Sequence, residues 1–445
     1  MTTAAATTLL TKGIVGLIWL AIIWLLTGEQ FVFAVRILFN IVVAIRSKRS
    51  LQPVVAATPC CGSADDGDDT AEESDDDEAA VKENATTWEE PSETLSFDNN
   101  NNKIIWGFWH SGEETLPGFC QLAVKSWRAH HPDWKIVILS DANYKHYVSP
   151  SDLPSTFASL KVQYRSDLIR LAVLRRYGGL YLDASYTIYR AFDDVWDQAE
   201  ARNDLYLTSL VTLSQSGELR FPNNCFILAP QPQNPVLVEW QRRCIAYLED
   251  PCLTTAAAPQ HPQFQRVAHH FSDPALGALS YLTAYFGVIW TLADVLYYEA
   301  PLRDYVADHV WILPSFRWSF DHVMIQNLTL PDKHILHGES YDEGLWSWIT
   351  RLPNALRIMF GNEPAVAQRM LEFGVAMKTS SDFYPHFHQP IEFHTQRPAS
   401  VGLIYRAAVD KQVFPVRQAD TIGARRVVPI VEAAEEATTT TVVRR

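Results

Sequence analysis

One carboxylate, Asp183, stands at the end of a short apolar stretch, Leu180–Leu182. The pattern indicates a buried strand followed by an acid, and α/β proteins bind ligands at the carboxyl ends of such strands. Two small residues come next, Ala184 and Ser185, where a second acid would complete a carboxylate pair. The lone acid is compatible with a metal site that has further ligands elsewhere, with a weakened metal site, or with a plain strand end.

A pair of opposite charges, Asp167 and Arg170, precedes this strand. Residues three apart share one face of a helix. Taken alone, the pair predicts an exposed ion pair worth roughly a few tenths of a kcal/mol. The predicted helix runs directly into Gly178-Gly179 and the strand that carries Asp183, which favours a functional role for the pair beside the strand end.

Alternating strands and helices are predicted to position these residues. Asp141 follows the second predicted strand as Asp183 follows the third, so both acids are expected at one edge of the sheet. A strand-helix-strand-helix-strand order is typical of right-handed crossovers and of an α/β fold with a mostly parallel sheet. The predicted strands are Ile104–Trp109, Lys135–Leu139 and Leu180–Leu182, and the predicted helices are Leu116–His130 and Gln163–Tyr177.

The segment around Asp183 resembles a known family. Ser166-Asp167-x-x-Arg170, Leu174 and Tyr177–Ser185 together look like the signature of capsular polysaccharide synthesis proteins. These are related to the DXD-motif sugar transferases, which include the initiating α-mannosyltransferases. The resemblance covers roughly residues 103–340, and further similar segments are Ile105–Trp109, Ser126-Trp127, Pro132–Leu139 and Asn224–Ala229.

The resemblance implies a GT-A fold, a Rossmann-like and mostly parallel sheet flanked by helices. It also implies transfer of a sugar, with retained anomeric configuration, from a UDP-sugar or GDP-mannose to a glycan or polysaccharide acceptor. Asp183 would be the catalytic and metal-binding acid, and the cofactor would be Mn²⁺ or Mg²⁺. Donor-binding roles are implied for Asp167, Arg170, Trp106, Gly179 and Ser185.

Histidines late in the chain are further candidates. Pro331–Gly338, followed by Trp346, loosely resembles a segment that contacts the diphosphate in sugar-nucleotide transferases, so His337 is a candidate metal ligand. The alternative is an ordinary loop histidine. His386, His388 and His394 have spacing that could suit a transition metal, but no Cys or acid cluster joins them, and a surface loop is favoured.

The chain divides into five predicted regions. Residues 1–50 are expected to anchor the protein in a membrane by a single span near residues 9–28. Residues 51–102 are an acidic linker predicted to be disordered. A glycosyltransferase domain at 103–350, a helical C-terminal extension at 351–420 with helical patterns to about Met377, and a disordered tail at 421–445 complete the prediction.

Charge and membrane features bound the function further. The net charge of −14 is carried by the linker, so the remainder is nearly neutral and nucleic-acid binding is not expected. Candidate N-glycosylation sites at Asn84 and Asn327 favour a Golgi or ER lumen, whereas the basic residues after the apolar segment do not. The aromatic stretch Tyr281–Tyr297 contains Asp294 and predicts a buried helix rather than a second membrane span.

Several alternatives stay open at this point. Cys225, Cys244 and Cys252 could include one disulfide or be buried free thiols. Because the second acid is missing, the chain could also be an inactive homologue that binds nucleotide or glycan. A membrane-tethered scaffold that binds only protein is the remaining alternative.

Overall fold

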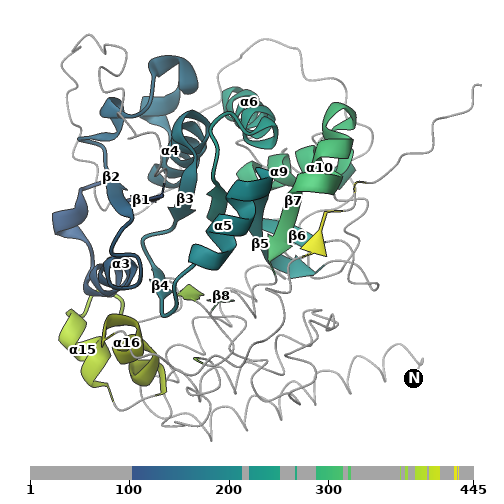
Figure 1. Cartoon of the computed structure of the whole chain (residues 1–445). Helices are drawn as coiled ribbons and strands as arrows, with labels where there is room; N and C mark the ends of the chain where they lie inside the picture. Colours follow the sequence, from purple (N-terminus) through teal and green to yellow (C-terminus); the bar gives the residue numbers. More distant parts are fainter. Residues whose placement is uncertain are drawn as a thin grey trace, which may run out of the picture.

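The computed structural model describes residues 103–212, 220–250, 266–267, 287–313, 319–321, 371, 376–378, 386–397, 400–410, 425–427 and 429. These residues form a mixed α/β fold, with a central sheet between layers of helices (Figure 1). The predicted anchor at 1–50, the linker at 51–102 and almost all of the tail at 421–445 lie outside them. Among the described residues, no helix is long and apolar enough to cross a membrane.

Seven of the described strands form the central sheet. β1, β2 and β3 pair in parallel, β6 runs antiparallel between β3 and β5, and β5 pairs in parallel with β7. The sheet is therefore mixed, with most strands in one direction, as predicted. The strand order is β10 (Arg425–Arg426), β7 (Val310–Leu313), β5 (Leu205–Thr212), β6 (Arg220–Ala229), β3 (Gly179–Leu182), β1 (Ile104–Phe108) and β2 (Lys135–Leu139).

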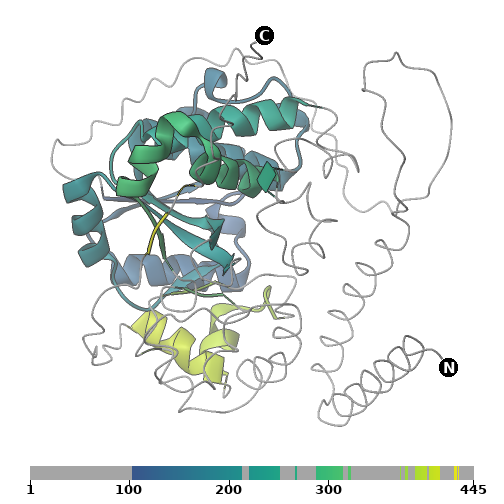
Figure 2. The same ribbon diagram turned by 90° about the vertical axis from the view of Figure 1, so that its right-hand side faces the viewer.

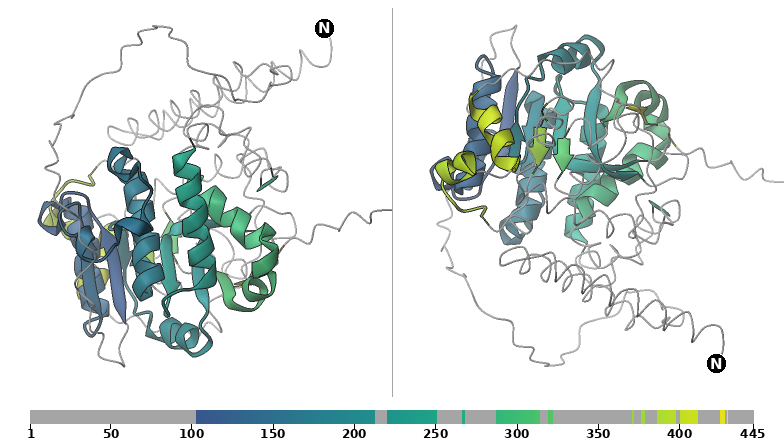
Figure 3. Two further views of the ribbon diagram at one scale, coloured as in Figure 1. Left: turned by 90° about the horizontal axis from the view of Figure 1, so that it is seen from above. Right: turned by 90° about the horizontal axis from the view of Figure 1, so that it is seen from below.

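Helices cover both faces of this sheet and bury two apolar cores. On one face, α4 and α6 lie side by side, next to α9 and α10 (Figure 3). On the other face, α3, α5 and the C-terminal α16 contribute the buried side chains. The helices are α3 (Gly118–His130), α4 (Val162–Tyr177), α5 (Asp193–Arg202), α6 (Pro235–Glu249), α9 (Gly287–Tyr298), α10 (Arg303–His309), α15 (Ile391–Gln396) and α16 (Ser400–Asp410).

A small second sheet joins the C-terminal part of the chain to the predicted catalytic domain. It consists of β4 (Tyr186–Ile188), β9 (Ala376–Lys378) and β8 (Ser319–Asp321), with β9 in the middle. Met377, near which the predicted helical patterns end, lies in β9, and Leu371 before it is helical. Helices α15 and α16 pack against α3 (Figure 2).

The Gly178-Gly179 turn between α4 and β3 requires glycine. The φ angles are +69° at Gly178 and +109° at Gly179, which L side chains rarely adopt. A Cβ on Gly179 would lie 2.9 Å from the Trp106 indole nitrogen. That nitrogen donates a hydrogen bond of 2.9 Å to the Gly178 carbonyl, so the buried tryptophan holds the turn in place.

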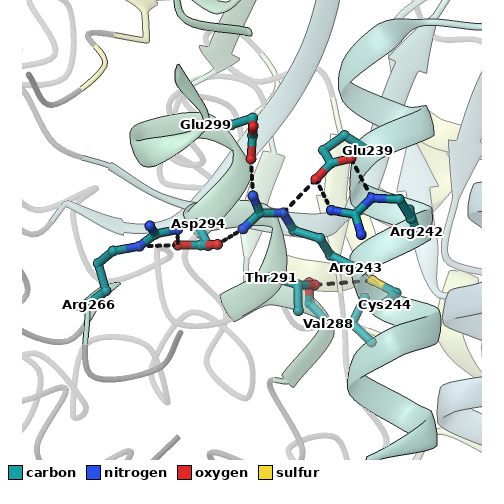
Figure 4. Close-up of polar contacts among 9 residues, drawn as sticks. All are labelled: Glu239, Arg242, Arg243, Cys244, Arg266, Val288, Thr291, Asp294 and Glu299. Atoms are coloured by element: carbon teal, nitrogen blue, oxygen red, sulfur yellow. Dashed lines mark hydrogen bonds and ion pairs between the residues drawn. The ribbon is translucent and has the colours of Figure 1, made fainter. Parts of the chain in front are cut away.

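Helix α9 confirms the prediction of a buried aromatic helix over the part that is described, Gly287–Tyr298. Its Asp294 is fully buried and is neutralised by Arg243 of α6 and by Arg266, whose Nε lies 2.8 Å from the carboxylate. Figure 4 shows Arg243 between Asp294, Glu299 and Glu239. Buried charges persist only when they are paired in this way.

The structure bears on two further predictions, a disulfide among the cysteines and a surface loop at the late histidines. Cys225 and Cys244 are buried free thiols, and Cys252 lies outside the described residues. The surface-loop prediction is wrong for His394, which is buried in α15 against Phe119 and Tyr405, and burial lowers its pKa to about 4.

Candidate functional site

The candidate site lies at the carboxyl ends of the parallel strands, where β3 delivers Asp183. The Asp183 backbone N–H donates to the Cys225 carbonyl of β6 at 3.0 Å, and its carbonyl accepts from the Tyr186 N–H at 2.9 Å. These bonds fix a tight turn between β3 and β4. The Asp183 side chain is 23% exposed, so solvent reaches it from the open edge of the sheet.

Arg170 of α4 is the centre of the site. Its guanidinium lies 3.1 Å from an Asp167 carboxylate oxygen and 3.2 Å from an Asp183 carboxylate oxygen. It also donates to the Asn224 carbonyl at 2.6 Å and stacks over the Tyr181 ring at 4.5 Å. Because this side chain is only 6% exposed and is held on several sides, its position is fixed by the fold.

The electrostatics keep Arg170 charged. Burial lowers its pKa, but the neighbouring Tyr181, Asp167 and Asp183 raise it by more, so the pKa lies above the usual value. The pair predicted as an i,i+3 ion pair on α4 is therefore present, but it is not an exposed surface pair. It is a buried bridge between two carboxylates.

Asn224, in the middle of β6, closes this arrangement on the other side. Its amide Nδ2 donates to the Asp167 carboxylate at 2.9 Å, while its carbonyl accepts from Arg170. Burial raises the pKa of Asp167 to about 6, an effect that the Arg170 charge opposes. The pKa of Asp167 thus lies closer to neutral pH than that of an exposed aspartate.

Lys378 of β9 reaches the same site from the C-terminal part of the chain. Its Nζ lies 2.7 Å from the second carboxylate oxygen of Asp183. Both oxygens of Asp183 therefore face a cation, Arg170 on one side and Lys378 on the other. We call Asp167, Arg170, Asp183, Asn224 and Lys378 the Arg170 cluster.

Asn224 and Lys378 were not predicted as site residues. Asn224 stands at the beginning of a segment that resembles the family, and that position was the available signal. Nothing local distinguishes Lys378 in the sequence, because its place depends on the pairing of β9 with β4, which sets Lys378 opposite Tyr186.

The other predicted site residues lie in different parts of the chain. Trp106 lies on β1 and Gly179 begins β3; both are buried at the turn that leads into β3, where they position the strand rather than face solvent. Ser185 is half-buried, two residues after Asp183. His337 lies outside the described residues. Asp141 follows β2 and pairs with Arg165 of α4 at 2.9 Å.

The fit of a divalent cation depends on this charge arrangement. Carboxylate oxygen is the ligand that Mg²⁺ prefers, so Asp183 suits the predicted metal in type. Among the described residues, however, no three His, Cys, Asp or Glu side chains converge as a ready metal site. Two carboxylates and two cations of the Arg170 cluster neutralise each other, so a cation fits best when a further negative charge enters with it.

Comparisons with known proteins point to one class of enzyme. Residues 78–253 match the family model described as capsular polysaccharide synthesis protein. The resemblance predicted from the sequence is confirmed. This match includes β1 through α6 and therefore every member of the Arg170 cluster except Lys378.

Curated relatives of the chain are named glycosyltransferases. The chain is 29% identical over 153 residues to O-glycosyltransferase braB of Annulohypoxylon truncatum, which covers 32% of this chain and 36% of the relative. It is 27% identical over 177 residues to glycosyltransferase afumC of Aspergillus fumigatus, covering 37% of this chain and 45% of the relative. The chain thus matches less than half the length of these relatives.

Two solved structures are also similar. One is the galactosyltransferase LgtC in complex with donor and acceptor sugar analogues, at 14% identity and a TM-score of 0.31, covering 71% of this chain and 98% of that one. The other is the PaToxG glycosyltransferase, at 15% identity and a TM-score of 0.25, covering 44% of this chain and 77% of that one. The fold described above rests on the chain's own strands and not on these two likenesses.

Proposed function

We propose that the chain is a glycosyltransferase that moves a sugar from a nucleotide-sugar donor to a glycan acceptor. The observation that carries this proposal is the Arg170 cluster, in which two carboxylates are fixed on one buried arginine at the carboxyl ends of parallel strands. Ligands of α/β sheets bind at this edge. The names of the curated relatives support the same class, and one of them is named an O-glycosyltransferase, which favours transfer to an acceptor oxygen.

The residues of the cluster suit the charge changes of such a reaction. Cleavage of a sugar from a nucleoside diphosphate leaves negative charge on phosphate oxygens, and fixed positive groups stabilise that charge most when they need not reorganise. Arg170 is fixed but its guanidinium already binds three partners of the cluster, so we assign it the role of holding Asp183 and Asp167 in place. Asp183, with its exposed edge, is the group that faces the donor.

A divalent cation is part of this proposal. Bound Mn²⁺ or Mg²⁺ would neutralise charge on the diphosphate, and Asp183 is the described carboxylate that would hold it. We retain His337 as a candidate second ligand and Ser185 as a candidate donor contact. The donor is a UDP-sugar or GDP-mannose, and the resemblance supports retention of the anomeric configuration.

We further propose that the enzyme is held at a membrane by residues 1–50 and projects on the acidic linker 51–102, in the Golgi or ER. The apolar composition of the first segment and the candidate N-glycosylation sites at Asn84 and Asn327 support this arrangement. Treating the expressed protein with a glycosidase tests it. A shift in electrophoretic mobility that Asn84→Gln or Asn327→Gln removes places that residue in the lumen.

The decisive experiment for activity compares two aspartate variants. A panel of UDP-sugars and GDP-mannose is incubated with the full chain and Mn²⁺, and release of nucleoside diphosphate is measured. Asp183→Asn is expected to lose nearly all of the release, whereas Asp197→Asn is expected to retain it. Asp197 is the matched control, because it also pairs with a lysine, Lys103 at 3.1 Å, but lies on α5 away from the cluster.

One observation favours a second candidate, an inactive homologue that binds nucleotide without transfer. In the part of the chain that the structure describes, both carboxylate oxygens of Asp183 already face a cation, Arg170 on one side and Lys378 on the other. Equal background release by the wild type and by Asp183→Asn, together with thermal stabilisation by a nucleotide, would support that candidate. If no nucleotide stabilises the protein, with or without Mn²⁺, the remaining alternative is a membrane-tethered scaffold that binds only protein.

A further inference from the structure

We propose that Ser126 and Trp127 of α3 are positioning residues for the donor site, because their side chains hold the turn that carries Asp183. The inference rests on the proposed function, since it concerns the same site. Ser126-Trp127 is one of the segments that resemble the family, and both residues are fully buried. They act through the backbone of β4 rather than on a reacting group.

A chain of hydrogen bonds runs from Trp127 to Asp183. The Trp127 indole Nε1 donates to the Tyr186 carbonyl at 2.5 Å. The Tyr186 N–H donates to the Asp183 carbonyl at 2.9 Å, and the Asp183 N–H donates to the Cys225 carbonyl at 3.0 Å. The turn from Asp183 to Tyr186 is therefore held at one end by β6 and at the other end by α3.

Ser126 holds the next part of β4. Its hydroxyl donates to the Ala123 carbonyl at 2.6 Å, which leaves the oxygen to accept from the Ile188 N–H at 2.9 Å. Tyr186 and Ile188 are two residues apart, so their backbone groups face the same edge of β4. Adjacent side chains of one helix thus supply hydrogen bonds that a neighbouring strand would supply in a larger sheet.

The packing around Trp127 fixes where these bonds are made. Gly107 of β1 makes room for the indole, because a Cβ there would lie 3.0 Å from two of the ring carbons and 3.0 Å from Cδ1 of Ile138. Helix α3 packs against β4, and the indole belongs to the core on that face of the sheet. Interiors packed this densely transmit a shift of one group to its neighbours. We therefore expect loss of the indole N–H to move the turn that carries Asp183.

A second tryptophan provides a matched control. Trp240 of α6 is also fully buried, and its Nε1 donates to the Val288 carbonyl of α9 at 2.8 Å. It belongs to the core on the opposite face of the sheet from Trp127. Trp240→Phe therefore removes the same kind of bond as Trp127→Phe, but in the other core. The two variants separate a positioning role from a general contribution to stability.

Steady-state kinetics of nucleoside diphosphate release test the role in the site. The full chain is assayed with Mn²⁺ and the donor it uses best, as wild type, Trp127→Phe, Trp240→Phe and Ser126→Ala. A displacement of about 1 Å at a reacting group can lower a rate by about a hundredfold. We expect kcat to fall at least about tenfold in Trp127→Phe, with the donor KM within about threefold of wild type, because the loss falls on the transition state. Ser126→Ala should lower kcat as well, whereas Trp240→Phe should keep kcat within about threefold of wild type.

Hydrogen exchange measures the same effect without any ligand. The amides of Tyr186 and Ile188 donate within this set of bonds, so they should exchange at least about tenfold faster in Trp127→Phe than in the wild type. Exchange of the β2 amides corrects for any change in overall stability. Ser126→Ala removes only one hydroxyl and should also speed this exchange, so it provides both measurements if Trp127→Phe does not fold.

The outcomes separate this inference from the proposed function. A kcat of Trp127→Phe within about threefold of wild type, or an equal loss in Trp240→Phe, overturns the positioning role and leaves the proposed function standing. Unchanged exchange at Tyr186 and Ile188 in both α3 variants also overturns it. If the wild type releases nucleoside diphosphate from no donor, the proposed function is wrong, and the exchange rates alone decide whether Ser126 and Trp127 hold the turn.

Discussion

Replacing Arg170 by methionine removes the positive charge that lies between two carboxylates. The guanidinium is 3.1 Å from Asp167 and 3.2 Å from Asp183, and it donates at 2.6 Å to the Asn224 carbonyl. In the variant, Lys378 still pairs with Asp183, but Asp167 loses its ion-pair partner and keeps its hydrogen bond from the Asn224 amide. Removing one partner of a buried ion pair costs about 3–5 kcal/mol, and we expect the free energy of unfolding at pH 7.5 to fall by that amount.

The loss of stability in Arg170→Met should depend on pH. The pKa of Asp167 is already raised to about 6 by burial, which the Arg170 charge opposes, and loss of that charge raises it further. When the pKa of Asp167 is higher in the folded state than in the unfolded state, the folded protein takes up a proton first as the pH falls. The free energy of unfolding therefore rises as the pH falls through the folded-state pKa. The deficit of Arg170→Met relative to wild type should therefore shrink between pH 7.5 and pH 5.

Equilibrium unfolding in urea, followed by far-ultraviolet circular dichroism, measures these changes. Arg170→Lys keeps the charge but loses the planar fork, and it should cost only about half as much. In the double variant Arg170→Met/Asp167→Asn, the two losses should be less than additive by roughly 2 kcal/mol. A loss below about 1 kcal/mol in Arg170→Met, or a deficit that grows as the pH falls, would refute the description of Arg170 as a buried bridge.

Three other predictions follow from buried groups. Burial lowers the pKa of His131 to about 4, so protonation near the ordinary value of 6.5 favours the unfolded state. Between pH 7 and pH 4.5, the free energy of unfolding of the wild type should fall by up to about 3 kcal/mol relative to that of His131→Gln. An equal difference between the two proteins at both pH values would contradict this. Residue 179 has a φ of +109°, and a Cβ there would lie 2.9 Å from the Trp106 indole nitrogen. Gly179→Ala should therefore lower the urea midpoint by an amount equivalent to at least about 2 kcal/mol in the free energy of unfolding. An unchanged midpoint would show that the turn can relax. Asp294→Asn should cost about 3 kcal/mol in the same assay, because two arginines lose a fully buried counter-charge, and a neutral result would show that the ion network is dispensable.

The central fold was largely predictable because its signals are local. The strand predicted at Lys135–Leu139 is β2 without change, and the strand predicted at Ile104–Trp109 is shorter by one residue. The helix predicted at Gln163–Tyr177 is α4, which begins one residue earlier and ends before the glycine pair. Apolar periodicity and glycine at a helix end act within a few residues, and both can be read along the chain.

Burial of particular side chains was less predictable. The histidines after residue 385 look like a polar loop in sequence, yet His394 lies in a core with Phe119 and Tyr405. The contact depends on the packing of α15 and α16 against α3, which joins segments far apart in the chain. A single histidine carries no local mark of such packing.

The sequence by itself determined the first part of the candidate site, and the tertiary structure decided the rest. Asp167, Arg170 and Asp183 are linked by one helix, one turn and one strand, so their proximity follows from local geometry. Lys378 is 195 residues from Asp183, and a three-residue strand such as β9 exists only because β4 and β8 supply its backbone hydrogen-bond partners. The charge that faces Asp183 was therefore set by strand pairing between distant segments, which no short stretch of the chain encodes.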